Sequence, residues 1–433
     1  MFYLNPDRVL DTALLQKMIG RYNLNVLPRL QKYKNYYDGI HAILRKEYTD
    51  PSKPCNKTVI NYCKNIADSY CGYLATPGYI TYSSQNDIEE LMNILRYNDY
   101  QAEDAELLLN LLVYGVSAEL MYMDKFGQTR FRLIDPTTCF GVYDDTLTND
   151  LLYFVRMYAV DEWDDSNTYY VDVYSDFDVK HYKMTGKSGA LELMGEDIHY
   201  FSQCPANICY MPDEKSIFDC ILTLQDSVNE LVSAEIDDYS AFCDAYLVLK
   251  GVDADADAIA SMKKNRVMII PEDATAEYLT KQANDTQIEN SLKRLHDSIY
   301  RTAQCPDFSS ETFVGGVSSG VAIRYRLTGM ETRAGKIEAE LKKALQRRIE
   351  IICGIATLKY GEEVFRDIKI AFKRNVPEDI TATINMINAL KGSVSDETLL
   401  AQLEFVEDVD AEIEAVQKQK TANMALYNFG ATG

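Results

Sequence analysis

The fragment Gly316-Val317-Ser318-Ser319-Gly320 has the residue pattern of a nucleophile elbow, in which a serine on a tight turn attacks a carbonyl carbon. That chemistry needs an acidic residue and then a histidine later in the chain, because the histidine takes the serine proton. His296 is the last histidine of this chain, and it precedes the fragment. The sequence therefore excludes a hydrolase triad in that order.

A second fragment, Gly186-Lys187-Ser188, resembles the end of a phosphate-binding loop. Such a loop needs a glycine five positions earlier, where this chain has His181. The fragment also lies between two strand-like runs, whereas a phosphate-binding loop opens a helix. A hairpin turn is the favoured interpretation.

Acidic residues at 253, 255 and 257 resemble the opening of a calcium-binding EF-hand loop. The turn position of that loop is Ala258 here, and the position of the bidentate acid is Lys264. A solvated turn or a helix cap is therefore favoured over a calcium site.

Further acidic clusters occur at Asp144-Asp145, at 161–165 and at 404–414. Such clusters could bind Mg²⁺ as in a nuclease, although an acidic chain produces acidic loops in any case. The four histidines are scattered, and none forms the spacing of a zinc site. The ten cysteines contain no C-x-x-C pair, so we expect reduced thiols, no metal and no cofactor.

The composition describes a large acidic protein. The chain has 433 residues, with 44 Lys plus Arg against 66 Asp plus Glu and a net charge of −22. This length predicts more than one domain, and the charge argues against a surface that grips nucleic acid through its phosphates. The first residues lack a signal-peptide pattern, and no apolar run approaches 18 residues. We expect a chain that is neither exported by a signal peptide nor membrane-spanning.

The periodicity predicts an α+β fold that is predominantly helical. Residues 1–130 are mostly helical, and 129–211 change to short strands of one meandering antiparallel sheet. A long helix follows at 216–243, with Ser216 as its N-cap. Two short strands at 245–250 and 266–271 then form a small β insertion before a second helix at 285–303.

A loop and one long helix follow the second helix. Residues 306–320 contain three glycines and cannot form a regular element throughout. Residues 321–352 predict an amphipathic helix whose polar face carries Arg333, Lys336, Lys342, Arg347 and Arg348. A strand at 368–372 and a helical C-terminal part complete the chain.

Three sequence blocks resemble portal proteins of tailed bacteriophages, the siphovirus-type head-to-tail connector family. The first joins residues 35–41 (Asn-Tyr-Tyr-Asp-Gly-Ile-His) to 56–68 (Asn-Lys-Thr-Val-Ile-Asn-Tyr-Cys-Lys-Asn-Ile-Ala-Asp) and Gly72-Tyr73-Leu74. The second runs from Pro306-Asp307-Phe308 to Phe313 and continues through 319–327 to Glu331. The third contains Phe372-Lys373-Arg374-Asn375-Val376-Pro377, 390–398 and 406–412. The blocks follow the order of that family and cover most of the chain.

The resemblance implies a portal architecture of wing, stem, clip and crown parts. A wing would span 1–215, and stem helices would span 216–243 and 285–305 on either side of a clip at 244–284. A tunnel loop would span 306–320, followed by a long wing helix and strand at 321–374 and a crown at 375–433. None of the three blocks falls in the sheet at 129–211, whose acidic loops are where this chain would depart from its relatives.

The resemblance also implies a function without enzymatic activity. Portals form a ring of twelve subunits at one capsid vertex, nucleate capsid assembly and conduct double-stranded DNA without sequence specificity during packaging and ejection. The implied partners are the terminase large subunit, the major capsid and scaffolding proteins and the head-completion (adaptor) protein. The protein would act in the virion, after assembly in the host cytoplasm.

Two sets of residues are candidates for this function. The channel-facing tunnel-loop candidates are Asp307, Phe308, Ser309, Ser310, Glu311, Thr312, Phe313, Val314, Gly315 and Gly316. The candidates for docking the motor at the clip are the basic residues Lys263, Lys264 and Arg266, for which a solvated turn is an equal alternative.

The residues fit a DNA conduit on physical grounds. An acidic wall repels phosphate and a glycine-rich loop can change shape as a duplex passes, because its backbone is poorly confined. The alternatives are a phage-encoded metal-dependent nuclease that uses the acidic clusters, or another capsid-associated structural subunit.

Overall fold

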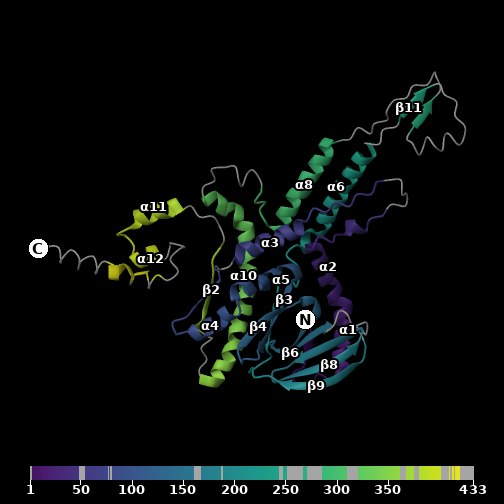
Figure 1. Ribbon diagram of the computed structural model, residues 1–433. Coiled ribbons are helices and arrows are strands. Elements are labelled where there is room, and N and C mark those ends of the chain that lie inside the picture. Colours follow the sequence, from purple (N-terminus) through teal and green to yellow (C-terminus); the bar gives the residue numbers. More distant parts are fainter. Residues whose placement is uncertain are drawn as a thin grey trace, which may run out of the picture. The chain divides into compact units, whose positions relative to one another are not determined.

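The computed structural model in Figure 1 describes most of the chain. The described residues are 2–47, 54–76, 78, 80–159, 167–186, 189–242, 247–250, 267–270, 285–309, 320–360, 367–374, 380–400, 409, 412–413 and 415–419. The chain divides into two compact units. The larger one contains Met1–Gly316 and Tyr325–Asn375, and the smaller one contains Val317–Arg324 and Val376–Gly433.

The first part of the larger unit is helical, as predicted. Its elements are β1 (Phe2–Leu4), α1 (Thr12–Arg21), α2 (Leu27–Tyr37), α3 (Tyr62–Leu74), β2 (Ile80–Ser83), α4 (Glu89–Tyr97) and α5 (Tyr100–Tyr114). A π-helical segment, Tyr22–Val26, joins α1 to α2. Asp11 and Asn61 accept backbone N–H groups at the starts of α1 and α3. Gly115 ends α5 at φ +75°, where a Cβ would lie 2.6 Å from the backbone of Lys215.

The strands after α5 form two sheets, where the sequence predicted one. The smaller sheet has the order β10 (Ala206–Tyr210), β3 (Val116–Met123) and β4 (Thr129–Ile134). The larger sheet contains β1 and the strands β5 (Cys139–Asp144), β6 (Leu151–Ala159), β7 (Thr168–Tyr174), β8 (Asp178–Thr185) and β9 (Leu191–Ile198). Strands β5 to β9 form the predicted antiparallel meander, and β1 adds to β5 in parallel. The split arises because β4 and β10 both pair with β3.

The predicted helix pair is present as α6 (Leu222–Phe242) and α8 (Asp285–Ala303). The prediction of Ser216 as the N-cap is wrong, because a 3-10 turn at Asp219–Ile221 precedes α6. The Ser216 hydroxyl instead donates to the Leu112 carbonyl at 3.1 Å and accepts from the Phe218 N–H. Between the helices in the chain, β11 (Leu247–Lys250) and β12 (Val267–Ile270) pair in parallel.

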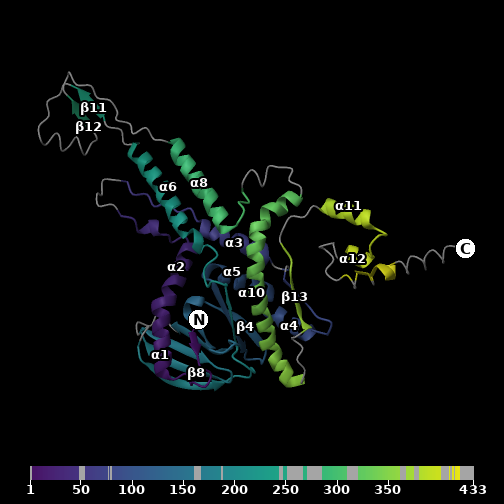
Figure 2. The same ribbon diagram turned by 180° about the vertical axis from the view of Figure 1, so that it is seen from behind.

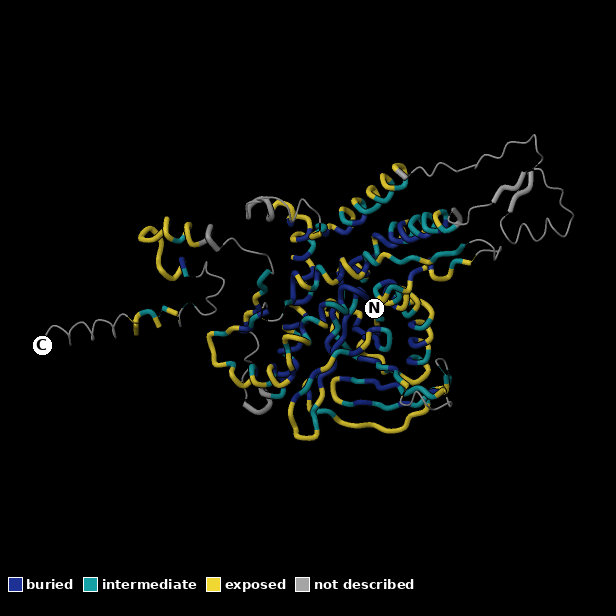
Figure 3. Tube along the Cα trace, turned by 45° about the horizontal axis from the view of Figure 1, so that its top comes forward, coloured by how far each residue is buried: buried dark blue, intermediate teal, exposed yellow. Residues whose placement is uncertain are grey.

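The long helix α10 runs over Gly320–Tyr360, which is 41 residues and longer than predicted. Its apolar positions are buried in the core of the larger unit, among them Met330, Ile337, Leu341, Leu345 and Ile349. Figure 3 shows that the buried residues gather in the body of this unit. The prediction that Arg348 lies on the polar face is wrong, since its side chain is fully buried.

After α10, β13 (Lys369–Phe372) pairs antiparallel with β2, which lies almost 300 residues earlier in the chain. The smaller unit contains the helices α11 (Ile380–Leu390) and α12 (Asp396–Leu400). The α+β class is confirmed. Among the described residues, no helix combines the length and the apolar character needed to cross a membrane.

Candidate functional site: the helix pair and the polar contacts at its base

Helices α6 and α8 lie side by side, as both Figure 1 and Figure 2 show. At 1.5 Å per residue, the 21 residues of α6 give a length of about 31 Å. The predicted motor-docking residues Lys263, Lys264 and Arg266 belong to the segment between the two helices and lie outside the described residues.

An extended segment, residues 54–61, runs along α6 and is called the strap below. Alternate backbone N–H groups, from the strap to the first residue of α3, donate to side chains spaced four residues apart on α6. The pairs, with the backbone donor first, are Asn56 to Asp237 (2.6 Å), Thr58 to Ser233 (3.0 Å), Ile60 to Asn229 (3.0 Å) and Tyr62 to Gln225 (2.9 Å).

The spacings of these two elements match. Four residues of helix rise about 6 Å, and two residues of extended chain rise about 6.6 Å. Side-chain acceptors four residues apart on α6 therefore lie opposite every second backbone N–H of the strap. The four acceptor residues on α6 are buried. Because a buried polar group without a partner is costly, the strap and α6 stabilise each other through main-chain contacts that are independent of the strap side chains.

His41 fixes the side-chain orientation of Asn229, one of these four acceptors, and the four hydrogen bonds are called the ladder below. Its Nε2 lies 2.9 Å from the Tyr36 carbonyl oxygen, which can only accept, so Nε2 carries the hydrogen. Its Nδ1 therefore accepts from Nδ2 of Asn229 at 2.7 Å, which turns the Asn229 oxygen towards the strap. Burial lowers the pKa of His41, in agreement with a neutral ring.

The first residues of the predicted tunnel loop are anchored to α8. One oxygen of Asp307 accepts from the N–H and hydroxyl of Ser309 at 2.9 and 2.6 Å, and the other lies 3.5 Å from Nε2 of His296. His296 lies in a ring cluster with Tyr62 and Tyr300, at centroid distances of 5.8 and 4.9 Å. Phe308 is 40% exposed.

The remaining loop candidates lie outside the described residues. They are Ser310, Glu311, Thr312, Phe313, Val314, Gly315 and Gly316. The structure thus places the root of the loop, at 307–309, against the base of the helix pair.

Arg333 of α10 connects the two helix ends. Its guanidinium donates to the carbonyl of Ala303, the last residue of α8, at 3.0 Å. It also donates to the carbonyl of Ile217, shortly before α6, at 2.8 Å. The hydroxyl of Tyr70 donates to the same Ala303 carbonyl at 3.1 Å. The base of the helix pair is therefore fixed against α10 by charge-assisted hydrogen bonds.

A second polar contact, called the polar clamp below, contains Tyr73, Glu331, Glu338 and Arg374. Arg374 binds Glu331 through Nε and Nη2 at 2.9 to 3.1 Å and donates to Glu338 at 2.5 Å. The hydroxyl of Tyr73 donates to Glu331 at 2.5 Å. These hydrogen bonds, with those of Arg374 foremost, hold the pKa of Glu331 below its usual range.

A third polar group, the buried ion cluster, contains Asp104 of α5, Glu119 of β3 and Arg348 of α10. Arg348 Nε lies 3.0 and 2.9 Å from the two Glu119 oxygens, and Nη1 donates to Asp104. All three side chains are at most 2% exposed. Tyr82 donates to Asp104 and Asn207 donates to Glu119, so most of the remaining oxygens are satisfied.

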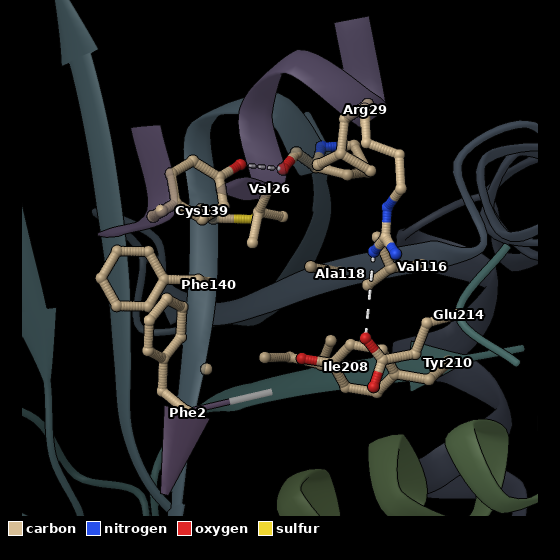
Figure 4. Close-up of a pocket in the computed structure, with 14 residues that line it drawn as sticks. Phe2, Val26, Arg29, Val116, Ala118, Cys139, Phe140, Ile208, Tyr210 and Glu214 are labelled. Atoms are coloured by element: carbon tan, nitrogen blue, oxygen red, sulfur yellow. Dashed lines mark hydrogen bonds and ion pairs between the residues drawn. The ribbon is translucent and has the colours of Figure 1, made fainter. Parts of the chain in front are cut away.

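A small apolar cavity between α2 and the sheets is not a substrate site. Figure 4 shows Phe2 and Phe140 on one wall, Ile208 and Tyr210 on another, and the Arg29 side chain at the rim. Its volume of about 50 Å³ holds only a few water molecules.

Asp144, one of the acidic residues that suggested a nuclease, has structural partners. The Asp144 carboxylate accepts from the hydroxyls of Thr146 and Thr148 at 2.7 and 3.0 Å and from the Asp150 N–H at 3.0 Å. These contacts close the turn between β5 and β6. Within the described part of the chain, no group of His, Cys, Asp and Glu side chains is arranged to hold a metal ion. Of the fragment Gly186-Lys187-Ser188, Gly186 directly follows β8 with φ +68°, whereas Lys187 and Ser188 lie outside the described residues.

The comparison with known proteins finds a similarity to phage portal proteins that covers nearly the whole chain. Residues 19–425 match the family described as phage portal protein, SPP1 Gp6-like. The chain belongs to this portal protein family. It is also similar to the portal protein of Bacillus phage SPP1, with 22% identity over 441 residues that cover 94% of this chain and 86% of the relative. The family is a structural, non-enzymatic component of phages whose members form oligomeric rings in the phage head.

The sequence blocks that resemble portal proteins meet in the structure. The first block supplies His41 and the strap, which bind α6, and it also supplies Tyr73. Tyr73, Glu331 and Arg374 come one from each block and meet in the polar clamp. Sequence reasoning gave no role to the acceptors on α6, although their spacing of four residues was visible as a polar stripe.

Proposed function

We propose that this chain is the subunit of a twelve-membered ring at one capsid vertex that conducts double-stranded DNA during packaging and ejection. The observation that carries the proposal is the family match over residues 19–425. The ring would also nucleate capsid assembly and contact the major capsid and scaffolding proteins. The site of action is the virion, after assembly in the host cytoplasm.

The parts of the chain receive the following proposed roles. Residues 1–215 and 321–374 form the wing, 216–243 and 285–305 the stem helices, 244–284 the clip and 375–433 the crown. The helix pair supports the stem assignment, because its two members run side by side from a base fixed by Arg333. The clip would dock the terminase large subunit, with Lys263, Lys264 and Arg266 as contacts, and later the head-completion protein.

The proposed channel wall is the loop at 306–320. A moving duplex presents phosphates at changing heights, so a wall should avoid bidentate pairs between arginine and phosphate. The charges in 306–316 are Asp307 and Glu311, both negative, and the whole chain carries −22. Asp307 at the anchored root would be the fixed end of this loop.

A packaging experiment tests the proposal. Heads assembled with the wild-type chain, with no portal chain, or with Lys263, Lys264 and Arg266 all changed to Glu are compared for encapsidated DNA. We expect full DNA only with the wild-type chain, and rings without packaging for the charge-reversed variant. Equal DNA content in heads that lack the chain would refute the conduit function. Normal packaging and neck attachment by the charge-reversed variant would refute only the docking assignment.

A further inference from the structure

The polar clamp lies within the larger unit, close in sequence to two of the points where the chain passes to the smaller unit. The chain crosses from one unit to the other after Gly316, after Arg324 and after Asn375. Arg374 directly precedes Asn375, and Glu331 and Glu338 lie on α10 shortly after it enters the larger unit at Tyr325. All four clamp residues belong to the larger unit. Their contacts therefore join, within that unit, two chain segments that each lead to the smaller unit.

The contacts of the clamp join three separate elements. Tyr73 is on α3, Glu331 and Glu338 are on α10, and Arg374 follows β13. Arg374 is only 21% exposed, and it has carboxylates on both its Nε and Nη2 sides. A fork that binds one carboxylate through two nitrogens fixes orientation as well as distance, unlike an exposed lysine pair.

We propose that Tyr73, Glu331, Glu338 and Arg374 are positioning residues that keep the part of α10 from Glu331 to Glu338 and the chain segment leaving β13 in one fixed arrangement. Arg374 binds both of these α10 carboxylates. A displacement of α10, which follows the loop at 306–319, therefore also displaces the segment leaving β13, and the reverse holds as well. The clamp thereby couples the C-terminal part of the chain to the helix that follows the channel loop. The channel role of that loop rests on the proposed function, whereas the coupling of the two crossings does not.

The test uses the full-length chain and the variant Arg374→Lys, which keeps the charge and removes the fork. Hydrogen exchange measured by mass spectrometry reports on 325–338 and 367–374 separately. The matched control is Glu340→Gln, which breaks the 2.8 Å pair between Lys343 and Glu340 on the same helix, where the lysine is 69% exposed. A third variant, Tyr73→Phe, removes one hydroxyl and keeps the ring.

We expect Arg374→Lys to speed exchange about tenfold in both segments, because a charge-assisted bidentate contact is lost from each. Tyr73→Phe is expected to give a smaller acceleration, about threefold, in the same two segments. The control should change neither. Acceleration confined to 367–374, or equal acceleration in the control, would overturn the coupling. If Arg374→Lys fails to fold, the same two outcomes are judged from Tyr73→Phe.

A second readout separates positioning from simple stabilisation. Rings of Arg374→Lys are expected to form, and heads assembled with them should contain several-fold less DNA than heads with Glu340→Gln. Normal DNA content together with accelerated exchange would show that the clamp only stabilises the fold. If the wild-type chain forms no ring, the proposed function fails, while the exchange measurement still decides whether the two crossings are coupled.

Discussion

Replacing Arg348 by methionine tests how the larger unit holds its buried charges. The side chain of Arg348 is fully buried, and Asp104 and Glu119 are at most 2% exposed. The variant would leave two buried carboxylates without their cation and would also remove the guanidinium that lies 4.5 Å from the ring centroid of Phe131. Removing one partner of a buried ion pair costs about 3 to 5 kcal/mol.

The structure places the expected loss near the middle of that range. Asp104 keeps its hydrogen bond from Tyr82, and Glu119 keeps the amide of Asn207, so neither carboxylate becomes fully unsatisfied. We therefore expect Arg348→Met to lower the free energy of unfolding of the larger unit by about 4 kcal/mol, a large part of the 5 to 15 kcal/mol usual for a domain. The triple variant with Asp104→Asn and Glu119→Gln removes all three charges and should recover to within about 2 kcal/mol of the wild type.

Urea denaturation followed by circular dichroism measures these differences. The control is Arg96→Met, which breaks an exposed pair with Glu89 at 2.8 Å and should cost less than about 1 kcal/mol. A loss below about 1 kcal/mol for Arg348→Met, or a triple variant no more stable than the single one, would show that the Arg348 cation does not stabilise the two buried carboxylates.

The pH dependence of this cluster gives a second check on the same variant. Burial raises the pKa of Asp104 in the folded chain, so the folded state binds that proton more tightly than the unfolded state. The stabilisation that comes from protonating Asp104 is therefore complete below the unfolded pKa of about 4. It declines as the pH rises through the folded pKa. Without the Arg348 cation this decline should be steeper, so Arg348→Met should regain stability relative to the wild type between pH 7 and pH 5. The triple variant should lack this gain.

Three further predictions concern assembly, the loop and the strap. Leu224 and Leu231 of α6 are half-buried, and changing both to Asp should prevent ring formation in light scattering coupled to size exclusion, whereas intact rings would remove α6 from the subunit interface. Changing Gly315 and Gly316 to Val should leave rings intact but reduce encapsidated DNA, because the loop becomes stiffer, and normal packaging would assign the channel role to other residues. Asn229→Leu removes the acceptor of the Ile60 N–H and the donor to His41. Thermal and urea denaturation should therefore show a free energy of unfolding lower by about 2 kcal/mol. An unchanged free energy would mean that the ladder of hydrogen bonds between the strap and α6 contributes little.

The sequence predicted the elements whose signal is local. Helix α8 was predicted at 285–303 and is found at Asp285–Ala303, because its apolar residues recur at helical spacing between turn-forming segments. The meander of β5 to β9 was likewise visible from alternating Tyr, Val and Phe. The family blocks then gave the identity that periodicity alone could not.

The contacts between distant segments could not be predicted in this way. Arg348 occurs on a helix rich in basic residues, and only its partners Asp104 and Glu119, more than 200 residues earlier, place it in the core. The strap has no periodic signal, because the hydrogen bonds that repeat along α6 are made by its backbone N–H groups and not by its side chains. The division into two sheets follows from pairing of β10 with β3, a contact that no local pattern specifies.

Electron microscopy of the purified full-length protein, viewed down the particle axis, shows whether this chain forms the ring that DNA conduction requires. We expect closed rings with an axial channel wide enough for a DNA duplex and with the same subunit number in most particles. Monomers, dimers or open sheets without a channel, at concentrations where the protein is folded, would contradict this expectation.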